Sequence, residues 1–168
     1  RRAGQCSGGG TMDVAVGVGS IILGSVLTVD DNITLDADAY GTNTISGSSV
    51  ALSGSLTLNN GSGDTLSLGN VISGTGSLVK NGNGNLALSG SNTYSGGTAL
   101  NAGTLTLGST TALGSGALTV GGASTLDSAS AITLGNDVVL NAGLTVLGTN
   151  DLTLNGDIGW SLFPWLGL

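Results

Sequence analysis

Residues 74–108 read GTGSLVKNGNGNLALSGSNTYSGGTALNAGTLTLG. Within this stretch, runs such as LAL (86–88) and LTL (105–107) alternate leucine with alanine or threonine, and glycine and asparagine separate the runs. An alternation with a period of two is typical of a β-strand that buries one face. Glycine and asparagine favour turns because they adopt backbone conformations that cost other residues steric strain. The stretch therefore predicts short strands joined by tight turns, without a helix.

The same pattern continues outside this stretch with one shared period. A first line of apolar residues has spacings of 21, 21, 20 and 20, and a glycine follows each member within three residues: Leu58, Val79, Leu100, Val120 and Leu140. A second line runs through Leu66, Leu86, Leu105, Leu126 and Leu144, and a third through Ile72, Tyr94, Leu113, Ile132 and Leu152. Three lines with one period predict an all-β, parallel β-helix (solenoid) of about seven coils, with three short strands per coil of about 20 residues.

Asparagine recurs at one turn of this repeat, at Asn60, Asn81, Asn101 and Asn141, and Gly121 replaces one member of the series. Because strands stack about 4.8 Å apart, these side chains can hydrogen-bond to one another in a ladder along the axis. Asparagine also suits a tight turn without any such ladder. The two interpretations are compatible, and neither makes the series a binding site.

The period divides the chain into three parts. Residues 1–13 form a poorly defined segment, residues 14–158 form one β-solenoid, and the repeat is strongest over residues 74–126. Residues 159–168 are an atypical aromatic tail that contains both tryptophans and the sole phenylalanine and proline. Within this tail Trp160 falls one period after Leu140, where the next inward residue of the first line is due. A truncation or junction explains the tail, and a natural aromatic cap is the alternative.

No segment is a convincing targeting signal. The apolar run VAVGVGSIILGSVL (14–27) is shorter than the ~20 residues that a membrane-spanning helix needs. Within it Val14, Val16 and Val18 alternate with small residues, which indicates a strand; a signal-peptide core is the alternative. The chain begins with Arg1 and not with methionine, so we expect a fragment of a longer protein.

Composition and charge disfavour several classes of protein. The chain has 32 glycines and only 3% aromatic residues, so small aliphatic side chains must fill thin layers. Ten aspartates against Arg1, Arg2 and Lys80 give a net charge of −7, with no basic cluster to bind nucleic acid or anionic lipid. Such a charge favours solubility. Cys6 is the sole cysteine, so no intrachain disulfide forms, and no apolar run precedes it as in a lipid-anchor signal.

Residues 74–108 closely resemble the autotransporter-associated β-strand repeat, which is also called the passenger-associated transport repeat. The family pattern runs G-x-G-x-L-x-K-x-G-x-G-x-L-x-L-x-G-x-N-x-Y-x-G-G-T, followed after a short gap by G-T-L-x-L. The residues that fill it here are Gly74, Gly76, Leu78, Lys80, Gly82, Gly84, Leu86, Leu88, Gly90, Asn92, Tyr94, Gly96, Gly97, Thr98, Gly103, Thr104, Leu105 and Leu107. Residues 112–126 resemble the usual continuation, whereas the rest of the chain shares only the period and the composition.

This resemblance implies a Gram-negative autotransporter passenger that folds as a right-handed parallel β-helix. It implies a cell-surface, outer-membrane-associated or secreted location and, in the full-length protein, a C-terminal outer-membrane β-barrel translocator as a partner. The family is associated with passenger folding and transport, and its long stalks often serve adhesion to host surfaces or other cells. We therefore expect a stalk segment that does not itself span a membrane; an adhesin surface that binds a host glycan or protein is the alternative.

The residues needed for common catalytic sites are missing. The chain has no histidine, which excludes histidine-based triads and histidine metal sites, and neither Cys6 nor Lys80 has a predicted activating partner. Carboxylate pairs do occur at Asp30/Asp31 and Asp36/Asp38, and parallel β-helices host polysaccharide-active enzymes that use aspartate clusters. Such sites need positive groups or a second acid of tuned pKa nearby. We expect no enzyme activity, no cofactor and no catalytic residue.

Calcium is the remaining candidate ligand. Asp137 and Asp157 lie one period apart, so they can occupy adjacent coils and share a cation. Residues 60–68 (NGSGDTLSL) resemble the calcium-binding nonapeptide repeat. They lack its doubled glycine and correctly placed aspartate, and they occur once where that architecture uses tandem copies. We expect no metal site, and the question of calcium binding at Asp137 and Asp157 stays open.

Overall fold

The computed structural model describes residues 10–11, 20–37 and 41–160. Within these ranges every strand is paired in parallel with a strand one coil away, and none of the described residues is helical. The predicted features outside the described ranges are Arg1, Arg2, Cys6, the Val14–Val16–Val18 alternation, Asp38 and the tail from residue 161 onward. The all-β, parallel solenoid predicted from the period is confirmed.

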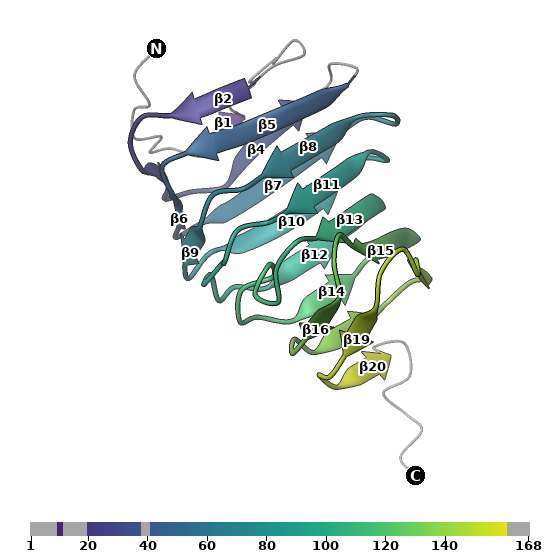
Figure 1. Cartoon of the computed structure of the whole chain (residues 1–168). Coiled ribbons are helices and arrows are strands. Elements are labelled where there is room, and N and C mark those ends of the chain that lie inside the picture. Colours follow the sequence, from purple (N-terminus) through teal and green to yellow (C-terminus); the bar gives the residue numbers. More distant parts are fainter. Residues whose placement is uncertain (1–9, 12–19, 38–40, 161–168) are drawn as a thin grey trace.

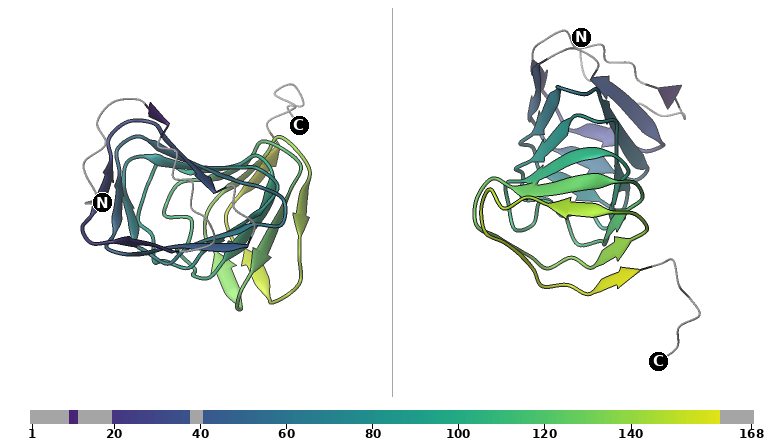
Figure 2. Two further views of the ribbon diagram at one scale, coloured as in Figure 1. Left: turned by 90° about the horizontal axis from the view of Figure 1, so that it is seen from above. Right: turned by 90° about the vertical axis from the view of Figure 1, so that its right-hand side faces the viewer.

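The coils stack along one axis (Figure 1), and the view along that axis in Figure 2 shows successive coils tracing similar flattened outlines. Each coil has three sides, and the strands on these sides form three stacks, which we call sheets I, II and III. Sheet I contains β1 (Gly10–Thr11), β4 (Ile33–Ala37), β7 (Ser55–Asn60), β10 (Ser77–Asn81), β12 (Thr98–Leu100), β14 (Leu118–Val120), β17 (Val138–Leu140) and β20 (Ile158–Trp160). Sheet II contains β2 (Ser20–Leu23), β5 (Thr42–Gly47), β8 (Thr65–Leu68), β11 (Asn85–Leu88), β13 (Gly103–Leu107), β15 (Ser124–Ser128) and β18 (Leu144–Val146).

Sheet III is interrupted, which corrects the prediction of three strands in every coil. Its strands are β3 (Leu27–Val29), β6 (Val50–Leu52) and β9 (Ile72–Gly74), then β16 (Ile132–Leu134) and β19 (Leu152–Leu154). In the two coils between β9 and β16 the third line is still buried, because Tyr94 and Leu113 are both 0% exposed. The backbone there turns irregularly through Gly97 and Gly114, which have φ of 83° and 60°. The apolar period therefore predicts the inward position correctly, but not the extended backbone.

The first predicted line is wrong at one member. Lys80, not Val79, pairs with Leu58 on one side and with Leu100 on the other. The step along the chain from Leu58 to Lys80 is longer than the step from Lys80 to Leu100, so the two coils differ in length. A single period applied to all coils ignores this difference in length. It therefore assigns Val79 to the inward position, although the side chain of Val79 faces the outer side of the strand. The later members are confirmed, and Leu140 pairs with Trp160 as predicted.

The second line is confirmed from Leu66 through Leu86 and Leu105 to Leu126, which are in register. Its last member is wrong, because Leu126 pairs with Val146 and Leu144 pairs with Ser124. Leu144 still faces the core side, two residues earlier along the same strand. In the third line Ile132 pairs with Leu152 as predicted.

The asparagine ladder forms in part. The side chain of Asn101 donates from Nδ2 to Oδ1 of Asn81 at 2.9 Å. Asn81 pairs with Asn59 rather than with Asn60, and Asn59 donates from Nδ2 to Oδ1 of Asp36 at 2.6 Å. Asn60 instead turns into the interior, where it is 1% exposed and donates to the backbone oxygen of Asn85. The prediction failed at Asn60 for the same reason as at Val79, namely the longer coil.

Leucine, isoleucine and valine from the three sheets fill the interior of the stack, as alternation predicts. The outward positions carry mostly threonine, serine, alanine and asparagine. In the part of the chain that the structure describes, there is no helix of the length and apolarity that crossing a bilayer requires.

Candidate functional site

The residues that define the motif of 74–108 gather inside the solenoid. Lys80 and Thr98 lie on sheet I, and Asn92 and Tyr94 lie in the irregular segment that replaces a strand of sheet III. All four side chains are buried, at 0%, 3%, 3% and 0% exposure in that order. We call Lys80, Asn92, Tyr94 and Thr98 the interior polar cluster. Polar groups inside a protein are costly unless they are hydrogen-bonded, so the partners of each member determine what it does.

Lys80 holds the corner between sheets I and II. The alternation of β10 places Lys80 on the same face as Leu78, which points inward. Its Nζ donates to the backbone oxygens of Asn81 and Gly82, both at 2.7 Å, and more weakly to that of Ala102 in the next coil at 3.4 Å. The ammonium thus satisfies carbonyl groups at a corner where the chain leaves the strand ladder. Burial lowers the pKa of Lys80 to about 8.

The corner also depends on a glycine at residue 82. Gly82 has a φ of 76°, a conformation that L side chains rarely adopt, and a Cβ placed there would lie 2.2 Å from the backbone oxygen of Asn60. The motif glycine therefore allows one coil to approach the coil before it, while Lys80 ties the same turn to the coil after it.

Asn92 joins three coils through one amide group. Its Oδ1 accepts from the backbone nitrogen of Ile72 at 2.8 Å, and its Nδ2 donates to the backbone oxygen of Ala112 at 2.6 Å. The side chain therefore does what a peptide group does in a strand ladder. It does so at the level where sheet III lacks a strand, so the hydrogen-bonded stack continues across the interruption.

Tyr94 fills the interior beside this interruption. Its hydroxyl shares a hydrogen bond of 2.6 Å with Oγ1 of Thr98. Thr98 stands between Leu78 and Leu118 in an otherwise aliphatic row of sheet I, so its hydroxyl requires this partner. Burial raises the pKa of Tyr94 to about 12, although the hydrogen bond with Thr98 acts in the opposite direction. The phenol is therefore neutral under ordinary conditions.

The interior polar cluster holds the fold and offers no reactive group to solvent. All four residues were visible in the sequence as members of a motif, but motif membership alone did not predict that they point inward together. A signal was available at Lys80, because its spacing of two from Leu78 assigns both residues to one face of the strand. Lys80 is also the sole basic side chain in the described ranges, and it is buried.

The structure does not assemble the aspartate pairs into one site. Asp36 accepts the hydrogen bond from Asn59, and its predicted neighbour Asp38 lies outside the described residues. Asp30 and Asp31 are exposed in the turn between β3 and β4. Since Lys80 is engaged inside the solenoid, no basic side chain of the described ranges stands beside either pair.

Asp137 and Asp157 do occupy adjacent coils, as their spacing predicts. Oδ1 of Asp137 accepts a hydrogen bond from the backbone nitrogen of Asp157 at 2.9 Å. Within residues 60–68, Asp64 is 4% exposed, and its Oδ1 accepts from the backbone nitrogen of Gly41 at 3.1 Å. Across the described residues, no three or more histidine, cysteine, aspartate or glutamate side chains come together as metal ligands would.

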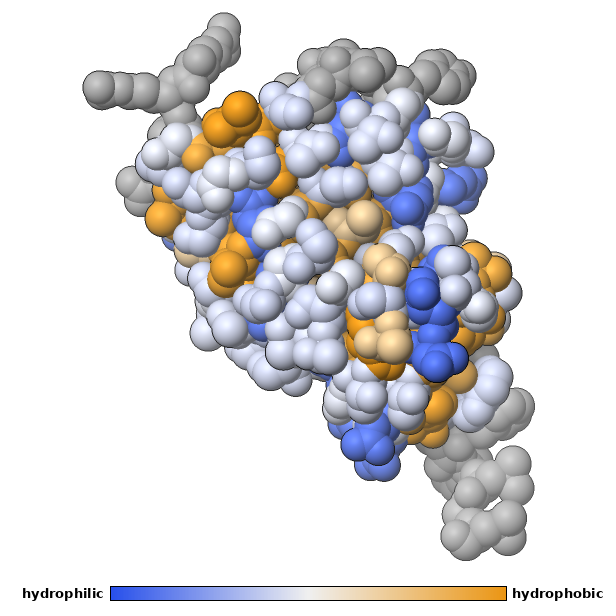
Figure 3. All heavy atoms as spheres, viewed as in Figure 1, coloured by the Kyte–Doolittle hydropathy of each residue, from blue (hydrophilic) through white to orange (hydrophobic). Residues whose placement is uncertain are grey.

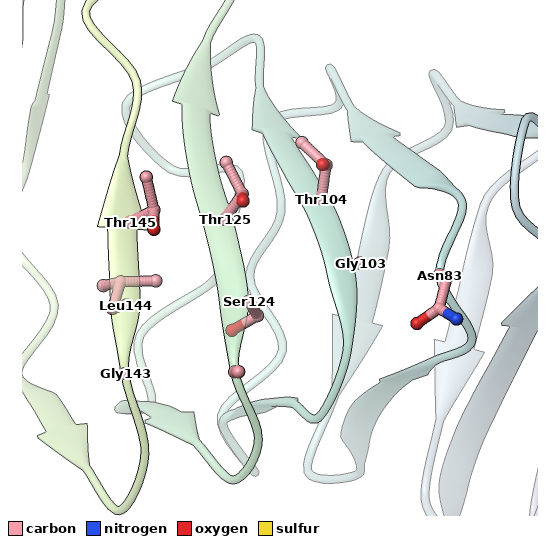
Figure 4. A pocket seen from close by; sticks show the side chains of 9 residues that line it. Asn83, Gly103, Thr104, Ser124, Thr125, Gly143, Leu144 and Thr145 are labelled. Atoms are coloured by element: carbon pink, nitrogen blue, oxygen red, sulfur yellow. The ribbon is translucent and has the colours of Figure 1, made fainter.

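The outer face of sheet II carries a shallow groove of about 530 Å³ (Figure 4), which we call the sheet II groove. It crosses four successive coils at the N-terminal ends of their sheet II strands. Its lining residues are uncharged: Asn83, Gly103, Thr104, Ala123, Ser124, Thr125, Gly143, Leu144 and Thr145. This groove was not predicted, because the sequence pattern identifies outward residues but not the depth of the surface they form.

Comparisons with known proteins agree with the motif. Residues 78–107 match the family model of the passenger-associated-transport-repeat. The chain is 39% identical over 107 residues to a protein of Brucella suis biovar 1 (strain 1330) named Adhesin BmaC autotransporter. That match covers 58% of this chain but 3% of the relative, so the chain spans a small fraction of the relative's length. No solved structure matches the chain.

Proposed function

Residues 78–107 are a passenger-associated transport repeat, and from this premise we propose that the chain is a stalk segment of an autotransporter passenger. In this role the segment supports secretion and folding at the surface of a Gram-negative bacterium and presents adhesive regions carried elsewhere. The full-length protein then supplies the outer-membrane translocator. The relative's name supports the autotransporter part of this proposal.

The proposal rests on one observation: the side chains of the motif residues lie in the interior of the solenoid and make their hydrogen bonds there. Lys80 reaches forward to Ala102, and Asn92 reaches forward to Ala112, each in the following coil. A coil that carries the motif therefore stabilises its neighbour through side chains as well as through the backbone ladder. The outer face shown in Figure 3 is dominated by residues of intermediate hydropathy, as expected of a stalk that presents adhesive regions carried elsewhere.

The mechanism that follows is sequential folding outside the cell. Each finished coil leaves parallel strand edges, and the next coil pairs with them. Because repeat proteins gain stability from contacts between neighbours, a coil with extra links to its neighbour favours continued folding. Folding at the surface then helps to draw the remaining chain outward.

The register of sheet I allows this to be tested by removing whole coils. Leu78 pairs with Thr98, and Leu118 pairs with Val138, so deletion of 78–97 or of 118–137 removes one coil and preserves the stacking. The chain is expressed as a passenger fused to an outer-membrane translocator, and the surface-exposed fraction is measured by protease accessibility. We expect deletion of 78–97, which removes Lys80, Asn92 and Tyr94, to reduce display severalfold.

Deletion of 118–137 is the matched control, because it shortens the stalk equally and removes no member of the interior polar cluster. We expect it to leave display close to that of the intact chain. Equal display of the two deletions would show that the repeat is merely one coil among others and would overturn its proposed role in secretion.

A second candidate is that the segment itself binds a host or cell surface. The relative is named an adhesin, which favours this candidate, and the uncharged sheet II groove offers a place for it. Loss of cell or glycan binding on deletion of residues 118–137, which keeps display and removes Ala123, Ser124 and Thr125 from the groove, would support direct adhesion. We propose no enzymatic activity for this segment; turnover of a polysaccharide that disappears in an Asp30/Asp31 variant would contradict that.

A further inference from the structure

Asn-Gly sequences are the places where this chain can most readily modify itself. An asparagine followed by glycine loses ammonia when the backbone nitrogen of the glycine attacks the side-chain carbonyl carbon, because glycine has no Cβ to hinder the approach. A hydrogen bond that holds the side chain or the attacking nitrogen opposes this reaction, since it must open first. The chain contains four such pairs: Asn60–Gly61, Asn81–Gly82, Asn83–Gly84 and Asn155–Gly156.

Two of the four pairs are held by the side chain of their asparagine. Asn60 is 1% exposed, and its Nδ2 donates to the backbone oxygen of Asn85 at 2.7 Å. Asn81 accepts at Oδ1 from Nδ2 of Asn101 at 2.9 Å. In both pairs a hydrogen bond to another coil must break before the side chain can turn toward the next residue. Both asparagines are therefore protected in the folded stack.

The other two pairs form a matched comparison. The side chains of Asn83 and Asn155 are both exposed, and neither makes a hydrogen bond with the described residues. Gly84 and Gly156 both pack closely against the preceding coil, because a Cβ built on them would lie 2.3 Å and 2.2 Å, respectively, from a backbone oxygen there. The two pairs therefore agree in the exposure of the asparagine and in the packing of the glycine.

The attacking nitrogen distinguishes these two pairs. The backbone nitrogen of Gly84 donates to the backbone oxygen of Asn60 at 3.0 Å. The backbone nitrogen of Gly156 has no hydrogen-bond partner among the described residues. Gly156 also lies in the turn between β19 and β20, which are each paired on one side only, so this turn opens more readily than a turn inside the stack. In the pair at 155–156, neither the side chain nor the attacking nitrogen is held.

We propose that Asn155 is a site of spontaneous deamidation in the folded chain. The nitrogen of Gly156 gives up its proton and bonds to Cγ of Asn155, the bond from Cγ to Nδ2 breaks, and ammonia leaves. Water then opens the resulting succinimide ring at either carbonyl carbon, which yields an aspartate at position 155 or its isoaspartyl isomer. Water is the sole co-reactant. The inference goes beyond the stalk and adhesion roles and depends on neither.

The product is expected to loosen the last described coil. A carboxylate at position 155 adds a negative charge close to Asp157, and the isoaspartyl isomer lengthens the main chain by one carbon atom. The backbone oxygen of Asp157 accepts from the backbone nitrogen of Val138 at 2.8 Å, where the pairing of β17 with β20 begins. Because repeats are stabilised by their neighbours, the effect is confined to β20 and leaves the earlier coils folded.

The reaction is measured by incubating the purified 168-residue chain at mildly alkaline pH and digesting samples with pepsin, at an acidic pH that halts deamidation. Tandem mass spectrometry then assigns each conversion of amide to acid to one residue. We expect Asn155 to convert on the order of tenfold faster than Asn83, because only the latter reaction must first break a hydrogen bond of the attacking nitrogen. In denaturant the two rates are expected to converge.

Two variants locate the site. Asn155→Gln is expected to abolish the early conversion, since glutamine would have to form a larger ring, whereas Asn83→Gln is the matched control and is expected to leave it unchanged. Hydrogen exchange at the amide of Val138 reports on β20. We expect this exchange to quicken as the unaltered chain ages and to stay constant in Asn155→Gln.

Three results would overturn the proposal. They are equal rates at Asn83 and Asn155 in a chain whose circular dichroism shows the β fold, an Asn155 that stays intact while another Asn-Gly pair reacts, and a preference for Asn155 that persists in denaturant. The last result would trace the preference to the sequence and not to the structure. None of these results concerns display or adhesion, so failure of this site and failure of the proposed functions are distinguishable.

Discussion

Replacing Leu86, Leu105 and Leu126 together with aspartate is expected to abolish cooperative folding of the solenoid. The three leucines are in register in sheet II, and each is 0% exposed. Truncating one buried leucine costs about 2–5 kcal/mol, and a buried, unpaired carboxylate adds to that cost. Domains are stable by only about 5–15 kcal/mol, so three such changes exceed the free energy of unfolding. The triple variant should therefore lack a thermal transition by circular dichroism.

The same three strands allow a control variant that places carboxylates on the outer face of the sheet instead of the inner face. Ala87 and Thr106 face outward in register with Asp127, which shows that a carboxylate is accepted in this outer row. Ala87→Asp with Thr106→Asp therefore creates a row of three carboxylates on the outside. We expect this variant to retain a cooperative transition, with a modest loss in free energy of unfolding that salt reduces. A triple leucine variant that melts like this control would contradict the assignment of the second line to the interior.

Replacing Tyr94 with alanine is expected to cost about 3–5 kcal/mol, because deletion of a large buried ring leaves a cavity in a close-packed interior. Tyr94 is 0% exposed and sits where sheet III has no strand to replace it. The change also removes the partner of the Thr98 hydroxyl, and a buried hydroxyl left without a partner costs about 1–3 kcal/mol. Urea denaturation measures the loss as a lower midpoint.

A double-mutant cycle separates the cavity from the hydrogen bond. Tyr94→Phe removes only the phenol hydroxyl, and Thr98→Val removes only its partner, at nearly constant volume. We expect each single change to destabilise, and the pair to cost less than the sum, because the two hydroxyls satisfy each other. Strictly additive costs, or a cost below about 1 kcal/mol for Tyr94→Ala, would show that Tyr94 is not packed as described.

The fold was predictable where one residue type repeats at one spacing. The line from Leu66 to Leu126 predicted the stacking of sheet II, because each of these coils crosses that sheet with a leucine at the same inward point. The first line failed at Val79, because the coil before Lys80 is longer than the coil after it. Hydropathy also directs the prediction away from lysine, although the long stem of lysine packs well among leucines when its ammonium meets carbonyl groups.

The candidate site was less predictable than the fold. Asn92, Tyr94 and Thr98 were visible as motif residues, but their partners depend on the irregular segments that interrupt sheet III. The apolar line predicts that Tyr94 points inward. It does not predict the conformation of the backbone between one inward residue and the next. The sheet II groove depends on Gly143 and on the shape of the coil corners, which a one-dimensional pattern does not encode.

Because the chain has a single lysine, the burial of the motif residues inside the stack is directly measurable. Lys80 and the α-amino group are the only amines, so an acetylating reagent has two targets. The lowered pKa of Lys80, about 8, leaves much of the amine unprotonated at pH 8, so only burial can prevent its reaction. We expect mass spectrometry of the native chain at pH 8 to show a modified N-terminus and an unmodified Lys80, and denaturant to expose Lys80 to complete modification. Acetylation of Lys80 in the native chain at the rate of a free lysine would place this residue outside the solenoid and contradict the claim.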